Sequence, residues 1–143
     1  MAYNPNSVVN HTFTFDEFTF TYTLAAGTTA ADVGKAVELD TSAAGKVKLA
    51  TDDAAIFGRL ETFEDRGNGL LVGAVSRKFR TKLPVKAGLT GVNIPALGDT
   101  VVGAGAGEVK ARDDGAGTPA KDNDPNVNTV IEVGTGFVIV EKF

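Results

Sequence analysis

Short runs of alternating polar and apolar residues are the feature that most constrains this chain. Residues 18–24 read Phe-Thr-Phe-Thr-Tyr-Thr-Leu, and Gly, Asp or Asn closes this run and most of the later ones. A period of two residues predicts β-strands, and frequent turn residues between short strands are typical of an all-β barrel or sandwich. A helix is weakly indicated only over residues 28–37, where Gly34 interrupts it, so we expect a loop or a single turn there. Further strands are expected at 35–39, 46–50, 56–63, 70–75, 77–85, 100–102, 108–111, 128–133 and 137–141.

The N-terminal aromatic residues change phase. Residues 12–15 also alternate, but Phe13 and Phe15 are odd-numbered, whereas the aromatic residues of 18–24 are even-numbered. Such a switch requires a bulge or turn, which we place at residues 16–17. These aromatic residues either fill the core or belong to an arm that adds a strand to a partner. We favour the arm for Phe13 and Phe15, and the core for Phe20 and Tyr22.

Composition excludes several classes of function. A chain of 143 residues with 43% hydrophobic and 22% charged residues is typical of one globular domain. With no Cys and one His, it lacks disulfides, thiolate zinc sites and multi-histidine metal sites. The net charge of −4 opposes nucleic-acid binding, and no apolar run is long enough for a membrane span. The N-terminus resembles no secretory signal, so we expect a soluble protein made in a cytosol.

The motifs that suggest catalysis or cofactor binding all have simpler interpretations. The Gly-rich residues 101–107 are not followed by a helix signal, so they predict a hairpin turn rather than a dinucleotide site. Adjacent carboxylates at 16–17, 52–53 and 64–65 would point to opposite faces of a strand, which favours turn positions. The acidic segment 113–126 lacks the ligand spacing of a calcium loop and predicts a surface loop. We therefore expect no enzyme activity, no cofactor and no metal.

Residues 77–82 carry four cations in six positions of an acidic protein: Arg77, Lys78, Arg80 and Lys82. In a strand, Lys78, Arg80 and Lys82 share one face, and Arg77 lies on the other. Cations on both faces argue against a central strand. Either this is an edge strand protected by its charges, or it is a docking strip for an acidic protein surface. The sequence leaves both interpretations open.

The two halves of the chain share an order of strands and turns, and the first half also resembles a known family. Residues 34–61 and 98–139 both read as strand, Gly turn, strand, Asp turn, strand, which suggests a duplicated β-unit. The first unit contains Gly-Lys-Ala-Val-Glu-Leu at 34–39, Ala-Gly-Lys-Val-Lys-Leu-Ala at 44–50 and Ile-Phe-Gly-Arg-Leu at 56–60. This ordered series resembles the capsid decoration (cement, head-stabilising) proteins of tailed bacteriophages. The resemblance covers about residues 24–112.

The resemblance implies a small β-tulip type of barrel without enzymatic activity. Such proteins sit on the outer surface of the virion, commonly as homotrimers that bridge major capsid proteins, and an N-terminal arm often orders on the capsid. On this basis residues 1–23 are the arm and 24–143 the decoration domain. The expected capsid-binding residues are Phe13, Phe15 and Phe18 of the arm, with Arg77, Lys78, Arg80 and Lys82 as electrostatic contacts.

Three alternatives remain. The chain could be another virion part, such as a head fibre, tail or adaptor domain. It could be a carbohydrate-binding β-module, although such modules use exposed aromatic platforms and this chain has no Trp and two Tyr. An enzyme is the alternative with the least support from the residues.

Overall fold

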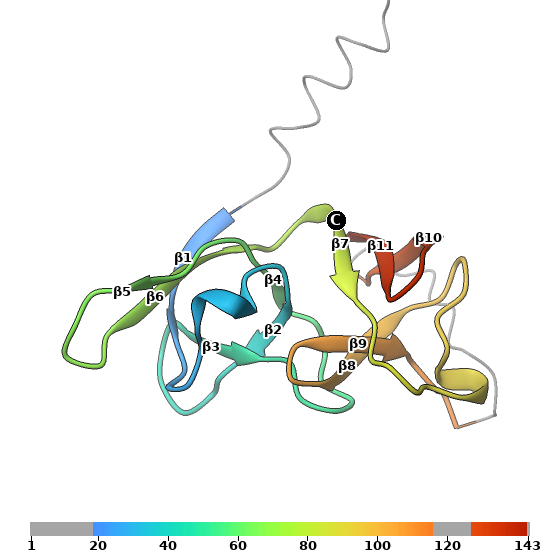
Figure 1. Cartoon of the computed structure of the whole chain (residues 1–143), viewed down its shortest axis with the longest axis horizontal. Helices are drawn as coiled ribbons and strands as arrows, with labels where there is room; N and C mark the ends of the chain where they lie inside the picture. Colours follow the sequence, from blue (N-terminus) through green and yellow to red (C-terminus); the bar gives the residue numbers. More distant parts are fainter. Residues whose placement is uncertain (1–18, 116–126, 143) are drawn as a thin grey trace, which may run out of the picture.

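Five strands close into a small barrel in this computed structural model, which describes residues 19–115 and 127–142. Around the barrel the order is β1-β3-β2-β4-β6, and β1 also pairs with β6 (Figure 1). Only β1 and β3 run parallel, and the other neighbours are antiparallel. The predicted all-β class with a barrel is therefore confirmed. The barrel strands are β1 (Thr19–Leu24), β2 (Ala36–Leu39), β3 (Lys46–Leu49), β4 (Gly58–Leu60) and β6 (Leu71–Ser76).

Apolar side chains at alternate strand positions fill the interior of the barrel. Each of its strands sends an apolar side chain inward, and together these form a buried cluster with Tyr22 packed against it. The cluster consists of Leu24, Val37, Val47, Leu60 and Val75. One 3-10 turn, η2 (Ala30–Asp32), is all that forms in the weakly helical segment, as predicted. A two-residue strand, β5 (Glu64–Asp65), extends the sheet beyond β6, so the turn predicted at 64–65 is wrong: the edge of β6 holds these residues extended.

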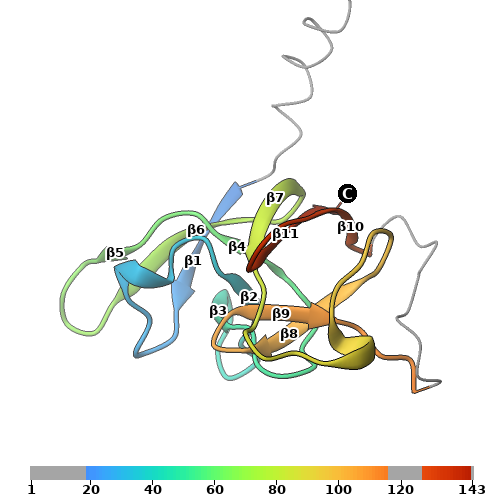
Figure 2. The ribbon, with the colours of Figure 1, turned by 45° about the vertical axis from the view of Figure 1, so that its right-hand side comes forward.

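The second half packs a three-stranded sheet against a hairpin. The sheet has the order β10-β11-β7, and the hairpin consists of β8 and β9 (Figure 2). Their shared core continues into the barrel through Ala36, Ala50 and Ile56. The two halves are thus joined by a continuous apolar interior. The elements are β7 (Phe79–Pro84), η3 (Gly91–Asn93), β8 (Val101–Gly105), β9 (Glu108–Ala111), β10 (Thr129–Val133) and β11 (Phe137–Lys142).

The Gly-rich segment forms the β8–β9 hairpin, as the sequence predicts. Its two turn residues, Ala106 and Gly107, have φ angles of 51° and 75°, as a type I′ turn requires. Gly103 lies so close to the neighbouring loop that a Cβ there would collide with the carbonyl oxygen of Thr51. Gly103 also exchanges backbone hydrogen bonds with residues 53 and 54. These glycines attach the hairpin to the barrel and need no ligand to explain them.

Three details differ from the sequence predictions. Phe20 is 52% exposed, so its predicted place in the core is wrong, although Tyr22 does pack on the barrel core. The predicted repeat is wrong in its third strand, because β4 pairs with β2 whereas β11 pairs with β7 and β10. The boundary predicted after residue 23 falls inside β1, whose ladder with β6 already begins at Thr19. The barrel therefore includes residues 19–23.

Candidate docking surface

The basic segment forms β7, which is an edge strand of the second sheet, as one of its two interpretations predicted. Phe79 and Leu83 are buried, and between them the strand turns its cations outward. The basic strip, by which we mean Lys78, Arg80 and Lys82, is exposed along this strand. The sequence had placed these three residues on one face, and the structure agrees.

Two members of the basic strip contact residues of β11. The Arg80 Nε lies 3.5 Å from the Glu141 Oε1, and the Arg80 side chain stays 68% exposed. The Lys82 Nζ lies 4.0 Å from the centre of the Phe137 ring. Both contacts are at the surface, where water and salt weaken them to about 1 kcal/mol or less. Neither contact prevents these cations from meeting an acidic partner.

Arg77 has a different role from the basic strip. Its guanidinium lies over the Phe57 ring, 3.6 Å from the ring centre, and its Nε donates a hydrogen bond to the Phe57 carbonyl at 3.0 Å. Arg77 thus joins the connection between β6 and β7 to the segment just before β4. A side chain engaged in this way holds the barrel to the second sheet, so we leave it out of the candidate docking surface.

Lys142, at the end of β11, supports the same junction and was missed by sequence reasoning. Its Nζ donates hydrogen bonds to the carbonyls of Ile56 at 2.6 Å and Phe57 at 3.3 Å. Burial, helped by the nearby charge of Arg77, lowers the pKa of Lys142 to about 8. In the sequence, Lys142 follows the acidic Glu141 and has the pattern of an ordinary exposed charge. No local pattern indicates that it is buried.

An apolar hollow lies on the second sheet and was also missed. It measures about 320 Å³ and is bordered by the exposed side chains of Ile94 and Val133, with Leu89 and Phe137 in its wall. Ile94 and Val133 come from the η3 loop and from the end of β10. The only signal in the sequence was an apolar residue beside Pro95, which is common in loops.

The predicted arm residues Phe13, Phe15 and Phe18 lie outside the described residues. The first described residue, Thr19, pairs with Ser76, only three positions before β7 begins. In Figure 1 the starts of β1 and β7 lie along the same side of the molecule. The chain therefore enters the barrel near the basic strip.

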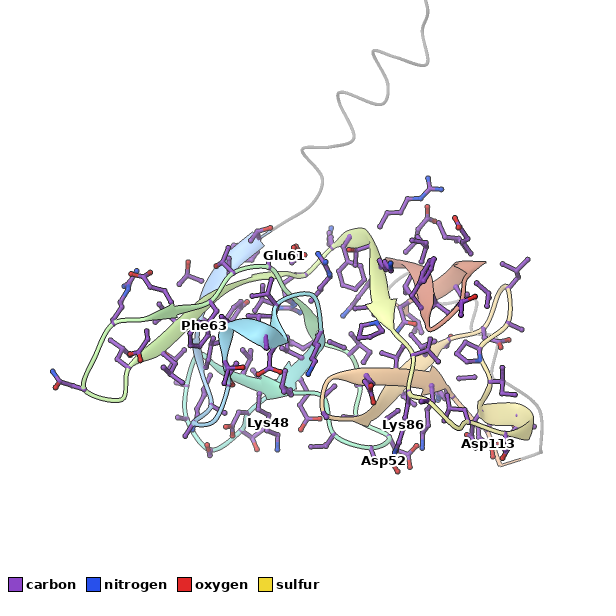
Figure 3. The ribbon with its side chains drawn as sticks, in the orientation of Figure 1. Lys48, Asp52, Glu61, Phe63, Lys86 and Asp113 are labelled. Atoms are coloured by element: carbon purple, nitrogen blue, oxygen red, sulfur yellow. The ribbon has the colours of Figure 1, made fainter. Side chains whose placement is uncertain are left out.

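A charge cluster between β9 and the loop after β3 is structural. Lys110 on β9 contacts the carboxylates of Asp52 and Asp53 at 2.9 and 2.8 Å, and their hydrogen bonds raise the Lys110 pKa. Asp52 and Lys86 lie near each other below the β8–β9 hairpin (Figure 3), and Lys86 donates a hydrogen bond to the Ala104 carbonyl. These contacts fasten the loop after β3 to the hairpin.

Comparisons with known proteins give no relatives. No family model, no curated protein and no solved structure matches this chain. Within residues 19–115 and 127–142, no group of three or more His, Cys, Asp or Glu residues could hold a metal ion. Nor does the described part of the chain contain a helix long and apolar enough to cross a membrane.

Proposed function

We propose that this protein is a structural component of a tailed-bacteriophage virion. It binds the outer surface of the capsid and stabilises the shell by bridging major capsid proteins. The observation that carries the proposal is the placement of the three segments that resemble capsid decoration proteins. Residues 34–39, 44–50 and 56–60 contain β2, β3 and β4, which are direct neighbours in the closed barrel.

The two predicted contact regions could reach one partner surface together. The chain enters β1 beside Ser76, and the basic strip begins two residues after Ser76. Phe anchors before Thr19 would fill apolar pockets of the capsid protein, and the basic strip would face its acidic side chains. We include a homotrimer in the proposal, because several copies acting together multiply a modest energy per contact.

The test uses expanded shells assembled from the major capsid protein alone. We expect the full chain to saturate these shells and to raise the temperature at which they break apart, measured by light scattering. Deleting residues 2–17 should abolish binding while circular dichroism shows the barrel still folded. The deletion stops there because a cut at residue 23 would remove most of the β1–β6 ladder.

Matched substitutions separate the two contact regions. Replacing Phe13, Phe15 and Phe18 together with Ala should abolish binding, whereas replacing Asn4, Asn6 and Asn10 with Ala should not. The double change Arg80→Glu and Lys82→Glu should weaken binding about tenfold or more. Arg66→Glu is the control, because Arg66 is a similarly exposed cation on the distant β5–β6 hairpin. If the full chain leaves shells uncoated, or maps to a tail or fibre, the proposal fails.

A further inference from the structure

Among residues 19–115 and 127–142, β7 has a hydrogen-bonding strand partner on one side only. It pairs along its whole length with β11, from Phe79 opposite Lys142 to Pro84 opposite Phe137. On its other side, backbone pairing begins at the end of the strand, where Val85 bridges to Val109 and the Lys86 N–H donates to the Val109 carbonyl. Within the part of the chain that the structure describes, Phe79–Leu83 therefore leave one edge of the sheet open.

The phase of the β7–β11 ladder identifies the backbone groups on that open edge. The Val85 N–H donates to the Gly136 carbonyl at 3.0 Å, so Val85 bonds toward β11. In an antiparallel ladder every second residue bonds to the same neighbour, so residues 79, 81 and 83 also bond toward β11. Arg80 and Lys82 then point their N–H and C=O groups to the open side. Pro84 follows in the same phase and has no N–H to offer.

The side chains at the open edge select what could pair there. Arg80 and Lys82 are exposed cations, so the same edge of a second copy would be repelled. A strand with carboxylates at alternate positions would instead place each acid opposite a cation. Such a strand would also receive two N–H donors and two C=O acceptors. Charges on an edge strand often serve only to prevent aggregation. An open edge whose side chains are all positive also favours pairing with an acidic strand.

We propose that the open edge of β7 accepts an extended acidic segment of a partner protein as an added strand. The main chain of Arg80 and Lys82 pairs with that segment, and their side chains face its carboxylates. This deepens the docking role assigned to the basic strip and rests on the proposed function, in which the partner is the capsid protein. The added strand is short, because β9 closes the edge from Pro84 onward.

A direct test uses nuclear magnetic resonance on the ¹⁵N-labelled full chain. The probe is an eight-residue peptide of alternating Thr and Glu with blocked ends, and the control is the same peptide with Lys in place of Glu. The acidic peptide should slow amide exchange at Arg80 and Lys82 about tenfold or more at saturation, and leave Thr81 and Leu83 nearly unchanged. The basic peptide should produce no change. Absence of binding at millimolar peptide, or protection without this alternation, would overturn the proposal.

Two substitutions at one position separate backbone pairing from charge. Lys82→Thr removes the charge but keeps the N–H, and Lys82→Pro removes both while leaving the bonds to β11 intact. The Thr variant should bind the acidic peptide a few times more weakly than the natural chain, and the Pro variant about tenfold more weakly again. Equal losses in the two variants would show that charge alone acts. If the Pro variant does not fold, Arg80→Pro with Arg80→Thr repeats the comparison.

Measuring binding to capsid shells distinguishes a failure of strand addition from a failure of the proposed function. If the peptide pairs with β7 but the full chain leaves shells uncoated, the proposed function fails and the strand-accepting edge stands. If shells are coated equally by Lys82→Thr and Lys82→Pro, the basic strip docks by charge, and strand addition is refuted.

Discussion

Replacing Lys142 with Met tests the electrostatics of the junction between the barrel and the second sheet. In the folded protein the pKa of Lys142 is lowered from its ordinary 10.5 to about 8. In the unfolded chain this lysine therefore keeps its proton over a pH range in which the folded protein has lost it. Unfolding then binds a proton, so Lys142 makes folding more favourable as the pH rises from about 8 toward 10.5. Below pH 8 the cost of burying the charge is fully present.

The size of the effect follows from linkage. Between pH 7.5 and 9.5, a pKa of about 8 against 10.5 corresponds to about 2 kcal/mol in the free energy of unfolding. Lys142 is partly open to solvent, so we reduce this to about 1 kcal/mol. All other ionisable groups are the same in the two proteins, so their contributions cancel in the comparison. The difference in stability between the natural chain and Lys142→Met isolates the contribution of this one group.

The assay is urea unfolding of both proteins, followed by circular dichroism at pH 7.5, 8.5 and 9.5. Relative to Lys142→Met, the free energy of unfolding of the natural chain should increase by about 1 kcal/mol from pH 7.5 to 9.5. A difference that is constant with pH would show that Lys142 stays charged in the folded state. A difference that changes in the opposite direction would show that its pKa is raised, and would refute the account of burial given above.

Three further substitutions test the packing of the hairpin. Gly103→Ala should destabilise the protein by about 3 kcal/mol in the same urea assay, because its Cβ collides with the backbone oxygen of Thr51. Asn128→Ala should cost about 2–4 kcal/mol, since the Asn128 amide both accepts from the Val101 N–H and donates to the Val101 C=O in the core. Ala106→Gly should add about 0.5–1 kcal/mol, because Ala106 has a φ of 51°; a loss of stability would contradict the assigned turn.

Local patterns were sufficient for most of the strands. Strict alternation predicted β1, and Gly or Asp at the ends of runs predicted the β2–β3 and β8–β9 hairpins. These features depend on residues close together in the sequence, which is why a single chain reveals them. The two-residue β5 has no alternation and forms only because β6 offers its edge, so it escaped prediction.

Contacts distant in sequence explain the features that were not predicted. Phe20 has the phase of an interior residue, yet it lies near the start of β1, beyond the buried cluster, and is exposed. Arg77 and Lys142 have the sequence pattern of surface charges. In the fold, both donate hydrogen bonds to backbone carbonyls of residues 56–57. The hollow beside Ile94 exists because the η3 loop meets the end of β10. Each of these depends on which strands become neighbours, which alternation does not encode.

The edge position of β7 is partly encoded in the sequence and partly fixed by distant contacts. Cations on both faces of residues 77–82 argued against a central strand, because a buried strand would have to desolvate them, and β7 is an edge strand. The same pattern could not say which backbone groups remain open. That follows from two distant contacts, the Val85 bond to Gly136 and the Val109 bridge, which fix the phase and the end of the free edge. The sequence thus suggested an acidic partner surface, and only the fold identifies Arg80 and Lys82 as the residues whose backbone groups face the open edge.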